Sequence, residues 1–315
     1  MDAVVIENGT VRVADRPDPQ PGDTQVLVAV RAAGLNGADL LQVRGHYPAP
    51  AGAPGDVPGL EMAGRVVAVG SRVTRVRPGE RVMGLVAGGA QATLVVAEQD
   101  HLLRVPDGTD WAAAGGFCEV FSTAHDALFT QCQLSIGDRL LVTGAAGGVG
   151  VAAVQLGACS GARVVASVRD PERRSAVAEL GAGEVIGAGD IADHGPYDVV
   201  LELVGAASLP QALGALATRG RVAVIGIGSG AAIELDLRLL MQRRARIGGS
   251  TLRARTQAEK AQVAAALAEH VVPLLAAGRI RVPVCETFPL SEAQQAYARF
   301  AAGGKLGKVV LAPEG

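Results

Sequence analysis

Short apolar runs bordered by glycine or proline dominate the first hundred residues of the chain. Val-bearing runs predict β-strands at residues 25–32, 64–69, 81–85 and 93–97. No regular alternation of strands with helices is visible there. Two stretches rich in proline and glycine, residues 15–23 and 47–58, predict loops, and the second is long enough to carry function. The N-terminal region is therefore expected to be β-rich.

From about residue 139, strand-like runs alternate with helical ones. Strands are predicted at residues 140–144, 163–168, 184–186, 198–204, 221–227 and 246–252, and helices at 149–160 and 171–180. Several of these strands are almost wholly apolar, as parallel strands covered on both faces are. Only about a dozen residues separate Ile186 from Val199, so a loop is expected to replace a full helix there.

The C-terminal part returns to the character of the N-terminal part. An Ala-rich helical stretch follows Thr256, and further runs predict a strand near 281–284, an amphipathic helix near 292–300 and a strand at 306–311. The fold class predicted is α/β, with a doubly wound parallel sheet inserted in a split β-rich domain. The domain limits expected are 1–117 with 256–315 for the β-rich domain, and 118–255 for the inserted one.

Length and charge agree with two globular domains and narrow the range of partners. The chain has 315 residues, more than a single hydrophobic core usually supports. Its net charge of −2 argues against a nucleic-acid partner. Residues 140–162 carry no charge and are long enough to span a bilayer, but a buried strand, a glycine-rich turn and a buried helix explain them better. No membrane partner is expected.

Cysteine usage bears on the cellular compartment. The four cysteines, Cys118, Cys132, Cys159 and Cys285, are dispersed, and no two share a CxxC spacing. This pattern argues against a four-cysteine zinc lobe and against a disulfide-stapled secreted fold. The N-terminus also lacks the features of a signal peptide. A cytoplasmic location is therefore predicted.

The sharpest motif is a glycine-rich turn between a predicted strand and a predicted helix. The usual GxGxxG pattern occurs here as AxGxxG, with Ala145, Gly147, Gly148, Val149 and Gly150 in the turn and the start of the helix. Glycines in such a turn let the backbone approach a pyrophosphate, whose charge suits a helix N-terminus. The motif predicts dinucleotide binding. The alternative is a packing turn rich in alanine and glycine.

The end of the second strand of this domain indicates which dinucleotide binds. An NAD site usually has an acidic residue there, whereas this chain has Ser167, Arg169 and Arg173. Cations without a competing carboxylate suit the 2′-phosphate of NADPH, although Asp170 lies close in sequence. The alternative is a pair of solvated surface arginines. NADPH is the cofactor predicted.

Several blocks along nearly the whole chain then indicate a family. They are Gly34-Leu35-Asn36-Gly37-Ala38-Asp39, Arg44-Gly45-His46-Tyr47-Pro48, Pro58-Gly59-Leu60-Glu61-Met62-Ala63-Gly64, Arg77-Pro78-Gly79-Glu80-Arg81-Val82, the glycine-rich turn, Gly249-Ser250-Thr251-Leu252-Arg253-Ala254-Arg255 and Gly307-Lys308-Val309-Val310-Leu311. In this order they resemble the zinc-independent medium-chain dehydrogenases/reductases, in the quinone oxidoreductase group. The resemblance implies a Rossmann domain inserted in a GroES-like catalytic domain.

The resemblance also implies an enzyme that works without a metal. The positions that hold catalytic zinc in zinc-dependent relatives match Asn36, Leu60 and Glu119, which do not form a Cys/His/Cys ligand set. The activity implied is transfer of a hydride from NADPH to a quinone or similar conjugated carbonyl. Such an acceptor spreads the incoming charge over its own conjugated system, so the protein must chiefly orient it and exclude water.

The resemblance places particular residues at the site. Asn36 and Tyr47 are the expected catalytic residues, as hydrogen-bond donors to the acceptor, and Tyr47 and Arg253 the expected substrate contacts. The residues expected along the cofactor channel are Thr123, Gly226, Ile227 and Lys308. A turn-forming Asn36 and a Tyr47 that only packs its loop remain open alternatives.

The same features are compatible with two other functions. An enoyl-thioester or alkenal reductase of the same superfamily is the nearest enzyme alternative, and an NADPH-binding protein without turnover is the alternative from another class. By analogy with smaller members of the superfamily, a homodimer is expected, joined through an edge strand near residues 233–236. The partner otherwise expected is a small quinone or enone.

Overall fold

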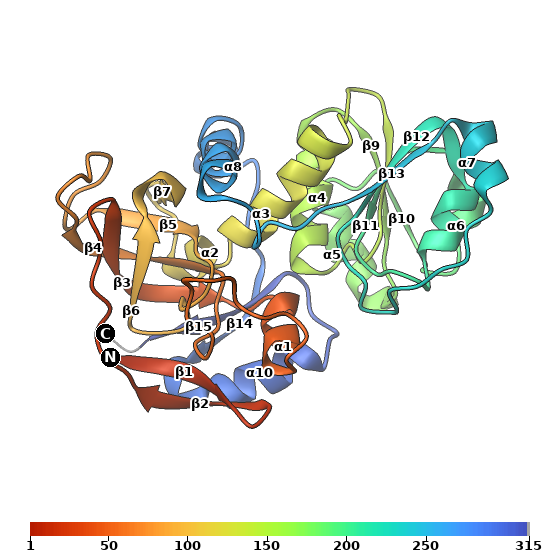
Figure 1. Ribbon diagram of the computed structural model, residues 1–315. Helices are drawn as coiled ribbons and strands as arrows, with labels where there is room; N and C mark the ends of the chain where they lie inside the picture. The colour runs from red at the N-terminus through yellow and green to blue at the C-terminus, as the bar shows by residue number, and fades with distance from the viewer. Residues whose placement is uncertain (314–315) are drawn as a thin grey trace. The chain divides into compact units, whose positions relative to one another are not determined.

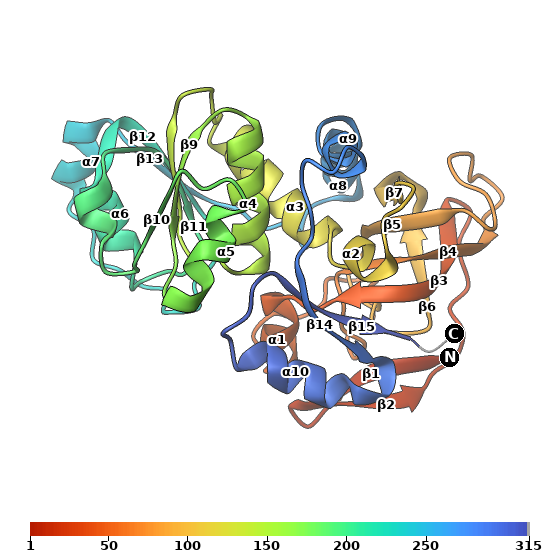
Figure 2. The same cartoon turned by 180° about the vertical axis from the view of Figure 1, so that it is seen from behind.

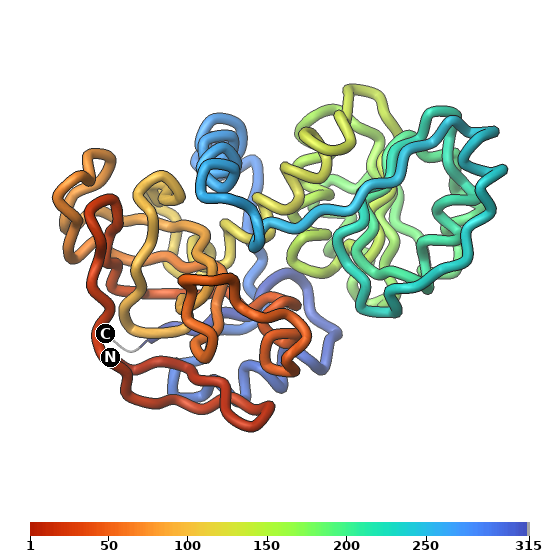
Figure 3. Tube along the Cα trace, viewed as in Figure 1, coloured from red at the N-terminus to blue at the C-terminus, as the bar shows by residue number. Residues whose placement is uncertain are grey.

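The computed structural model describes residues 1–313, which divide into two units. Unit 1 consists of residues 1–122, 252–304 and 308 onward, and unit 2 of residues 123–251 and 305–307. The chain thus leaves unit 1 after Ser122 and returns at Leu252, whereas the sequence suggested boundaries after residues 117 and 255. Both the red N-terminal and the blue C-terminal parts of the chain belong to unit 1 (Figure 3).

Unit 1 is rich in β-structure. Its strands are β1 (Asp2–Glu7), β2 (Thr10–Asp15), β3 (Gln25–Gly34), β4 (Glu61–Val69), β5 (Arg81–Leu85), β6 (Leu94–Glu98), β7 (Leu102–Arg104), β14 (Val284–Pro289) and β15 (Lys308–Ala312). Seven of these form one sheet in the order β14-β15-β3-β4-β5-β7, with β6 on β3, while β1 and β2 form a separate hairpin. The hairpin is not among the strands predicted from the sequence.

The helices of unit 1 are short apart from one. They are α1 (Gly37–Val43), α2 (Trp111–Gly115), α8 (Gln257–His270), α9 (Val272–Ala276) and α10 (Ala293–Ala301), with 3₁₀ turns η1 (Gln99–His101) and η5 (Leu290–Glu292). The longest, α8, starts with a capping box in which Thr256 and Glu259 bond each other's backbone N–H groups. Helix α10 packs on β2, β14 and β15 (Figure 1).

Alternation in β3 builds the core of unit 1. Val26, Val28 and Val30 are buried at every second position and pack against Met62 and Val82 from the neighbouring strands. The register then sets the site, because the last residues of β3 pair with β4 at Ala63 and with β15 at Val310. Residues far apart in the sequence are thereby brought together at the end of β3.

Unit 2 is an open parallel sheet. Its strands are β8 (Arg139–Val142), β9 (Arg163–Ser167), β10 (Glu184–Ile186), β11 (Tyr197–Glu202), β12 (Leu216–Val224) and β13 (Arg246–Gly249). The order is β10-β9-β8-β11-β12-β13 and each neighbouring pair is parallel. This is the doubly wound order of a dinucleotide-binding sheet, which confirms the predicted fold class.

Helices lie on both faces of the sheet in unit 2. They are α4 (Gly148–Cys159), α5 (Arg174–Ala178), α6 (Leu209–Gly214) and α7 (Leu237–Arg243), with turns η3 (Pro171–Arg173) and η4 (Ile191–His194). Figures 1 and 2 show α4 and α5 on one face and α6 and α7 on the other. A four-residue 3₁₀ turn, η4, stands where a loop was expected between Ile186 and Val199.

Two further expectations are settled in unit 2. The uncharged stretch at 140–162 contains β8, the glycine-rich turn and α4, and no helix within residues 1–313 is long and apolar enough to cross a membrane. Residues 233–236, suggested as an edge strand, are instead irregular backbone before α7. The strand at that edge of the sheet is β13.

Helix α3 (Cys118–His125) follows α2 and contains the boundary between the units, and a π-helical turn, η2 (Asp126–Gln131), continues it into unit 2.

Candidate active site

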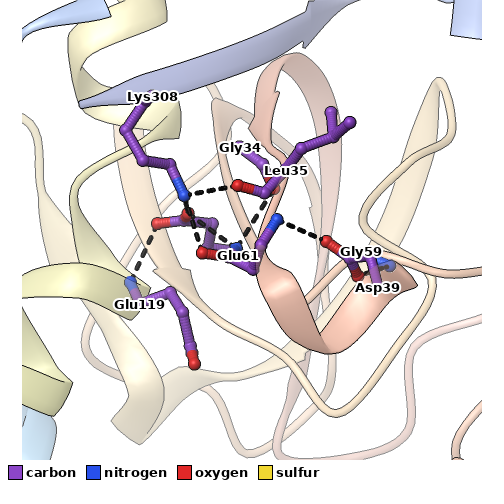
Figure 4. A network of polar contacts seen from close by, with 8 residues as sticks. Gly34, Leu35, Asp39, Gly59, Glu61, Glu119 and Lys308 are labelled. Atoms are coloured by element: carbon purple, nitrogen blue, oxygen red, sulfur yellow. Dashed lines mark hydrogen bonds and ion pairs between the residues drawn. The ribbon is translucent and has the colours of Figure 1, made fainter. Parts of the chain in front are cut away.

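A buried ion pair lies in unit 1 beside the end of β3, between β4 and β15. The Lys308 ammonium is 2.6 Å from Glu61 Oε1, and the two side chains are 2% and 0% exposed. The same ammonium donates to the Leu35 carbonyl at 2.8 Å (Figure 4). It also donates to Asn36 Oδ1 at 2.7 Å. All three ammonium protons of Lys308 are thus used inside the protein.

Gly34 makes room for this pair. A Cβ at position 34 would lie 2.4 Å from Glu61 Oε1 and 2.9 Å from Lys308 Cε. A side chain there would displace the ion pair, so the close approach of β3 to the pair requires glycine.

The side-chain amide of Asn36 is hydrogen-bonded within this network. Asn36 precedes α1, is 8% exposed, and its Nδ2 donates to Glu61 Oε1 at 3.0 Å and to the Gly34 carbonyl at 3.3 Å. With Oδ1 bound to Lys308, the amide bonds to protein through both of its polar atoms. Contact between Asn36 and a substrate, as suggested by the sequence, stays a prediction and would require one of these bonds to be shared.

Asp39 fixes the backbone around the network. Its carboxylate accepts the N–H of Asn36 at 2.8 Å and that of Gly59 at 3.2 Å, and burial raises the pKa of Asp39 to about 6. Gly59 has a φ of +106°, and a Cβ there would lie 2.6 Å from the backbone nitrogen of Gln91. The segment that leads to Glu61 is therefore tied to α1.

Glu119 adds a second carboxyl group beside the ion pair. The backbone N–H of Glu119, in the first turn of α3, donates to Glu61 Oε2 at 2.8 Å. Burial, and next the negative charge of Glu61, raise the pKa of the Glu119 carboxyl to about 8, while Lys308 and Arg253 oppose the rise. Much of this carboxyl is therefore protonated at neutral pH.

A small cavity of unit 1, about 20 Å³ in volume, opens beside Glu119. Its lining is mostly apolar, with an acid and two basic side chains: Leu60, Leu85, Val86, Glu119, Leu252, Arg253 and Lys260. Since about 10–15 Å³ is enough for one water, the cavity has room for a water molecule or a carbonyl group.

Arg253 holds the loop that carries Tyr47. Its guanidinium donates to the carbonyls of Ala87 at 2.9 Å and Tyr47 at 3.0 Å, and to Gln42 Oε1 at 2.8 Å. It also lies 5.2 Å from the centre of the Tyr47 ring. Arg253 is 7% exposed, so its hydrogen bonds serve the protein, while Tyr47 is partly exposed. The structure brings these two predicted substrate residues together.

The glycine-rich turn of unit 2 has the geometry that the motif predicts. It joins β8 to α4, and Gly147, which has no side chain to cap the helix, occupies the N-cap of α4. A Cβ at Gly150 would lie 2.5 Å from the Gly144 carbonyl oxygen, so this position requires glycine. The N-terminus of a 12-residue helix, approached by a turn without bulky side chains, fits a dinucleotide pyrophosphate.

The residues predicted to select the cofactor lie at the carboxyl end of β9 or just after it. Ser167 is 3% exposed and its carbonyl accepts the N–H of Ala145 at 3.1 Å, which joins the strand to the turn. Arg169 is exposed, and Arg173 lies 3.6 Å from Asp170, measured from Nε to Oδ2. Basic groups are thus available at this edge of the sheet, and Asp170 partly offsets them.

The remaining residues predicted to contact the cofactor are spread over both units. Thr123 is 8% exposed and Ile227 is 52% exposed, and a Cβ at Gly226 would lie 2.2 Å from the Leu203 carbonyl oxygen. Lys308, which the resemblance suggested for the cofactor channel, has its ammonium in the ion-pair network described above.

Sequence reasoning did not assign a role to Glu61, Asp39 or Glu119. A signal was present, since both glutamates interrupt runs of apolar residues, one between Leu60 and Met62 and the other between Cys118 and Val120. A carboxylate in such a run needs a partner if it is buried. Which partner it has depends on strand register, which the sequence does not state.

The residues at the three zinc-ligand positions do not fit a zinc ion. Leu60 has no donor atom, and Asn36 Oδ1 already accepts a hydrogen bond from the Lys308 ammonium, whose positive charge opposes a second cation. Within residues 1–313, no three His, Cys, Asp or Glu side chains form a group that would hold a metal. No chemical step is therefore assigned to a metal.

Comparison with known proteins agrees with this architecture. Residues 22–133 match the alcohol dehydrogenase GroES-like domain, and residues 148–269 match the domain described as zinc-binding dehydrogenase. A quinone oxidoreductase from Pseudomonas aeruginosa is 32% identical over 313 residues, covering 95% of this chain and 94% of the relative. The pikromycin polyketide synthase component PikAII from Streptomyces venezuelae is 48% identical over 139 residues, which are 44% of this chain and 4% of that protein.

Solved structures are also similar to this protein over the whole chain. The crystal structure of a quinone oxidoreductase from Pseudomonas syringae pv. Tomato DC3000 superimposes with a TM-score of 0.88 and 29% identity, covering 99% of each chain. With the two domain matches, the parallel sheet of unit 2 and a relative aligned nearly end to end, the chain belongs to the quinone oxidoreductase group of the medium-chain dehydrogenase/reductase superfamily.

Proposed function

We propose that this protein reduces a quinone or a similar conjugated carbonyl, using NADPH as the hydride donor and no metal. As a member of its superfamily the chain is an NAD(P)H-dependent oxidoreductase; the proposal concerns the acceptor, the form of the cofactor and the absence of zinc. The observation that carries it is the 32% identity to a quinone oxidoreductase over nearly the full length of both chains. The donor set around Asn36, which does not suit zinc, supports the metal-free part.

NADPH would be held mainly by the first half of unit 2. Its pyrophosphate would meet Ala145, Gly147, Gly148, Val149 and Gly150 at the start of α4, and its 2′-phosphate would meet Ser167, Arg169 and Arg173 beyond β9. Thr123, Gly226 and Ile227 would border the nicotinamide, which supplies a hydride when bound. Since the ammonium protons of Lys308 are all engaged, we propose that this residue acts by holding Asn36.

The acceptor would lie against residues of unit 1. Tyr47 offers a ring to pack on a flat acceptor, and Arg253 holds its backbone in place. Asn36 is fixed by Lys308 and Glu61, so its amide would present one defined orientation. A conjugated acceptor needs little electrophilic help, so these residues would chiefly have to orient the acceptor and keep water away from it.

Two other functions remain alternatives. An enoyl-thioester or alkenal reductase is favoured by one specific observation, the 48% identical segment of a polyketide synthase component. An NADPH-binding protein without turnover would keep the nucleotide site and lack activity. We further propose a homodimer located in the cytoplasm.

Purified protein mixed with NADPH and either a para-quinone, an enone or an enoyl thioester separates these functions. We expect NADPH to be oxidised fastest when the acceptor is the quinone. Reduction of the quinone should be slower when NADH replaces NADPH, and a zinc chelator should not change its rate. Faster turnover of the enoyl thioester would favour the first alternative. Binding of NADPH without turnover of any acceptor would overturn the enzyme proposal.

A further inference from the structure

Hydride transfer to a carbonyl acceptor also needs a proton, and most polar groups near the site are already committed. Lys308 uses three protons on protein acceptors, Arg253 donates to three oxygens, and Asp39 accepts two backbone N–H groups. The Cys118 thiol is 1% exposed, and burial raises its pKa well above the usual value. These groups hold the site together and are poor sources of a proton.

Glu119 differs from them in where its side chain points. Only its backbone N–H bonds to Glu61, and Figure 4 shows its side chain directed away from the Glu61–Lys308 pair. That side chain lines the small cavity together with Leu60, Leu252 and Arg253. The cavity has room for one water or one carbonyl group, so an acceptor oxygen placed there would be within reach of the Glu119 carboxyl.

We propose that Glu119 is a catalytic residue that protonates the oxygen of the acceptor in the cavity beside α3. This inference rests on the proposed function, since it supplies the proton which that reduction consumes. Asn36 and Tyr47 would orient the acceptor, whereas Glu119 would supply the proton.

The step balances as a two-electron reduction. The acceptor gains a hydride, and with it two electrons, from the reduced dinucleotide, which becomes oxidised. The O–H bond of Glu119 breaks and a new O–H bond forms on the acceptor oxygen. Water then returns a proton to the carboxylate. For a quinone the sum is quinone, reduced dinucleotide and one proton giving hydroquinone and oxidised dinucleotide.

The surroundings of Glu119 suit this role. Glu61 and Asp39 add negative charge that favours the protonated form, whereas Lys308 and Arg253 limit the effect. Lys260, from α8, also lines the cavity. Burial, and next the charge of Glu119, raise the pKa of Tyr47. Because its pKa is about 8, the Glu119 carboxyl is mostly protonated at pH 7. That pKa is also close to the working pH, as an efficient general acid requires.

The test compares Glu119→Gln, Glu119→Asp and the wild type. Glutamine keeps the size of the side chain but has no proton to donate, so kcat is expected to fall by about 10²–10⁴-fold. The alkaline limb of the kcat/KM profile near pH 8 should disappear with it, while the dissociation constant of NADPH stays unchanged. Aspartate, a shorter acid, should recover part of the rate. Glu269→Gln, whose native side chain is 78% exposed, serves as the control and should match the wild type.

A readout independent of turnover accompanies the kinetics. Infrared difference spectra between pH 6 and pH 9 should show loss of a carboxylic acid band in the wild type that is absent from Glu119→Gln. A wild-type enzyme that reduces quinones, with a Glu119→Gln variant of equal rate and pH profile, would overturn this inference alone. This inference would also be overturned if Tyr47→Phe or Lys260→Met, and not Glu119→Gln, showed the large fall in kcat. A wild type that reduces no acceptor would overturn the proposed function instead.

Discussion

Lys308 and Glu61 form a buried ion pair, with 2.6 Å between the ammonium nitrogen and one carboxylate oxygen. The pair joins β15 to β4 across the end of β3, and Asn36 and the backbone of Glu119 bond to the same carboxylate. Loss of one partner would leave the other charge without compensation in a place that water does not reach. We therefore expect the pair to contribute both to the stability of unit 1 and to the geometry of the candidate site.

Replacing Lys308 by methionine tests this dependence. The Glu61 carboxylate would remain buried and unpaired, so the free energy of unfolding should fall by about 3–5 kcal/mol in urea titrations. The double variant Lys308→Met/Glu61→Gln removes the orphaned charge and should recover part of the loss. Arg12→Met, which breaks an exposed ion pair with Glu7, should be nearly neutral. Equal losses in the two single variants would contradict the argument.

The pair also shows where sequence reasoning reaches its limit. Alternating and continuous apolar runs predicted the parallel sheet of unit 2, because periodicity reports which faces are buried. The glycine-rich turn was predicted down to Gly150, because local backbone geometry requires glycine there. The ion pair was not predicted, since Glu61 and Lys308 are brought together by the pairing of β3 with β4 and of β15 with β3.

The roles of single residues were harder to predict than the fold. The resemblance names Arg253 as a substrate contact, and this contact stays a prediction. The three protein acceptors of its hydrogen bonds are visible only in the folded loops. The edge strand was expected near residues 233–236, where apolar and acidic residues alternate, but that segment has no strand neighbour within the described chain. Pattern alone does not report pairing partners.

Arg253→Lys should loosen the Tyr47 loop. A lysine carries one nitrogen and cannot reach Ala87, Tyr47 and Gln42 together, so the KM for the quinone is expected to rise by about tenfold. The dissociation constant of NADPH, measured by fluorescence titration, should change little. Arg255→Lys, two residues further along, is the matched control. An unchanged KM for the quinone would show that the loop does not depend on this guanidinium.

Stability should depend on pH through Glu119. Its pKa rises from 4.5 to about 8 on folding, so between these values the folded state binds more protons than the unfolded state. The free energy of unfolding contributed by this group therefore decreases as pH increases from about 4.5 to 8, by at most about 1.4 kcal/mol per pH unit, and is constant above. Asp39, with a pKa of about 6, has the same sign over a lower range.

Urea titrations at pH 5, 7 and 9 measure this effect. The difference in stability between Glu119→Gln and the wild type isolates Glu119 from all other titrating groups. It should shift in favour of the variant as the pH is raised, and level off above pH 8. A difference that is independent of pH would mean that the Glu119 carboxyl titrates normally in the folded protein.

Arg173→Glu should weaken binding of NADPH if Arg173 faces the 2′-phosphate. Reversal of charge at the carboxyl end of β9 is expected to raise the KM for NADPH at least tenfold and to affect NADH much less. Arg163→Glu, at the opposite end of the same strand, should leave both constants unchanged. Because Asp170 already offsets part of the charge of Arg173, Asp170→Asn should strengthen binding of NADPH modestly. Equal effects of Arg173→Glu on both cofactors would contradict this assignment.

The proposed homodimer would be joined through β13. This strand closes one edge of the sheet of unit 2 and its residues are exposed, as are the apolar side chains of Leu237 and Met241 on α7. An exposed edge strand beside apolar groups favours pairing with a second copy, and a lysine on such an edge opposes it. Ile247→Lys is therefore expected to convert the dimer to a monomer in size-exclusion chromatography with light scattering. Ile136→Lys, at a site that is 87% exposed and away from this edge, should leave the mass unchanged. A wild-type monomer, or a dimer that withstands Ile247→Lys, would exclude this interface.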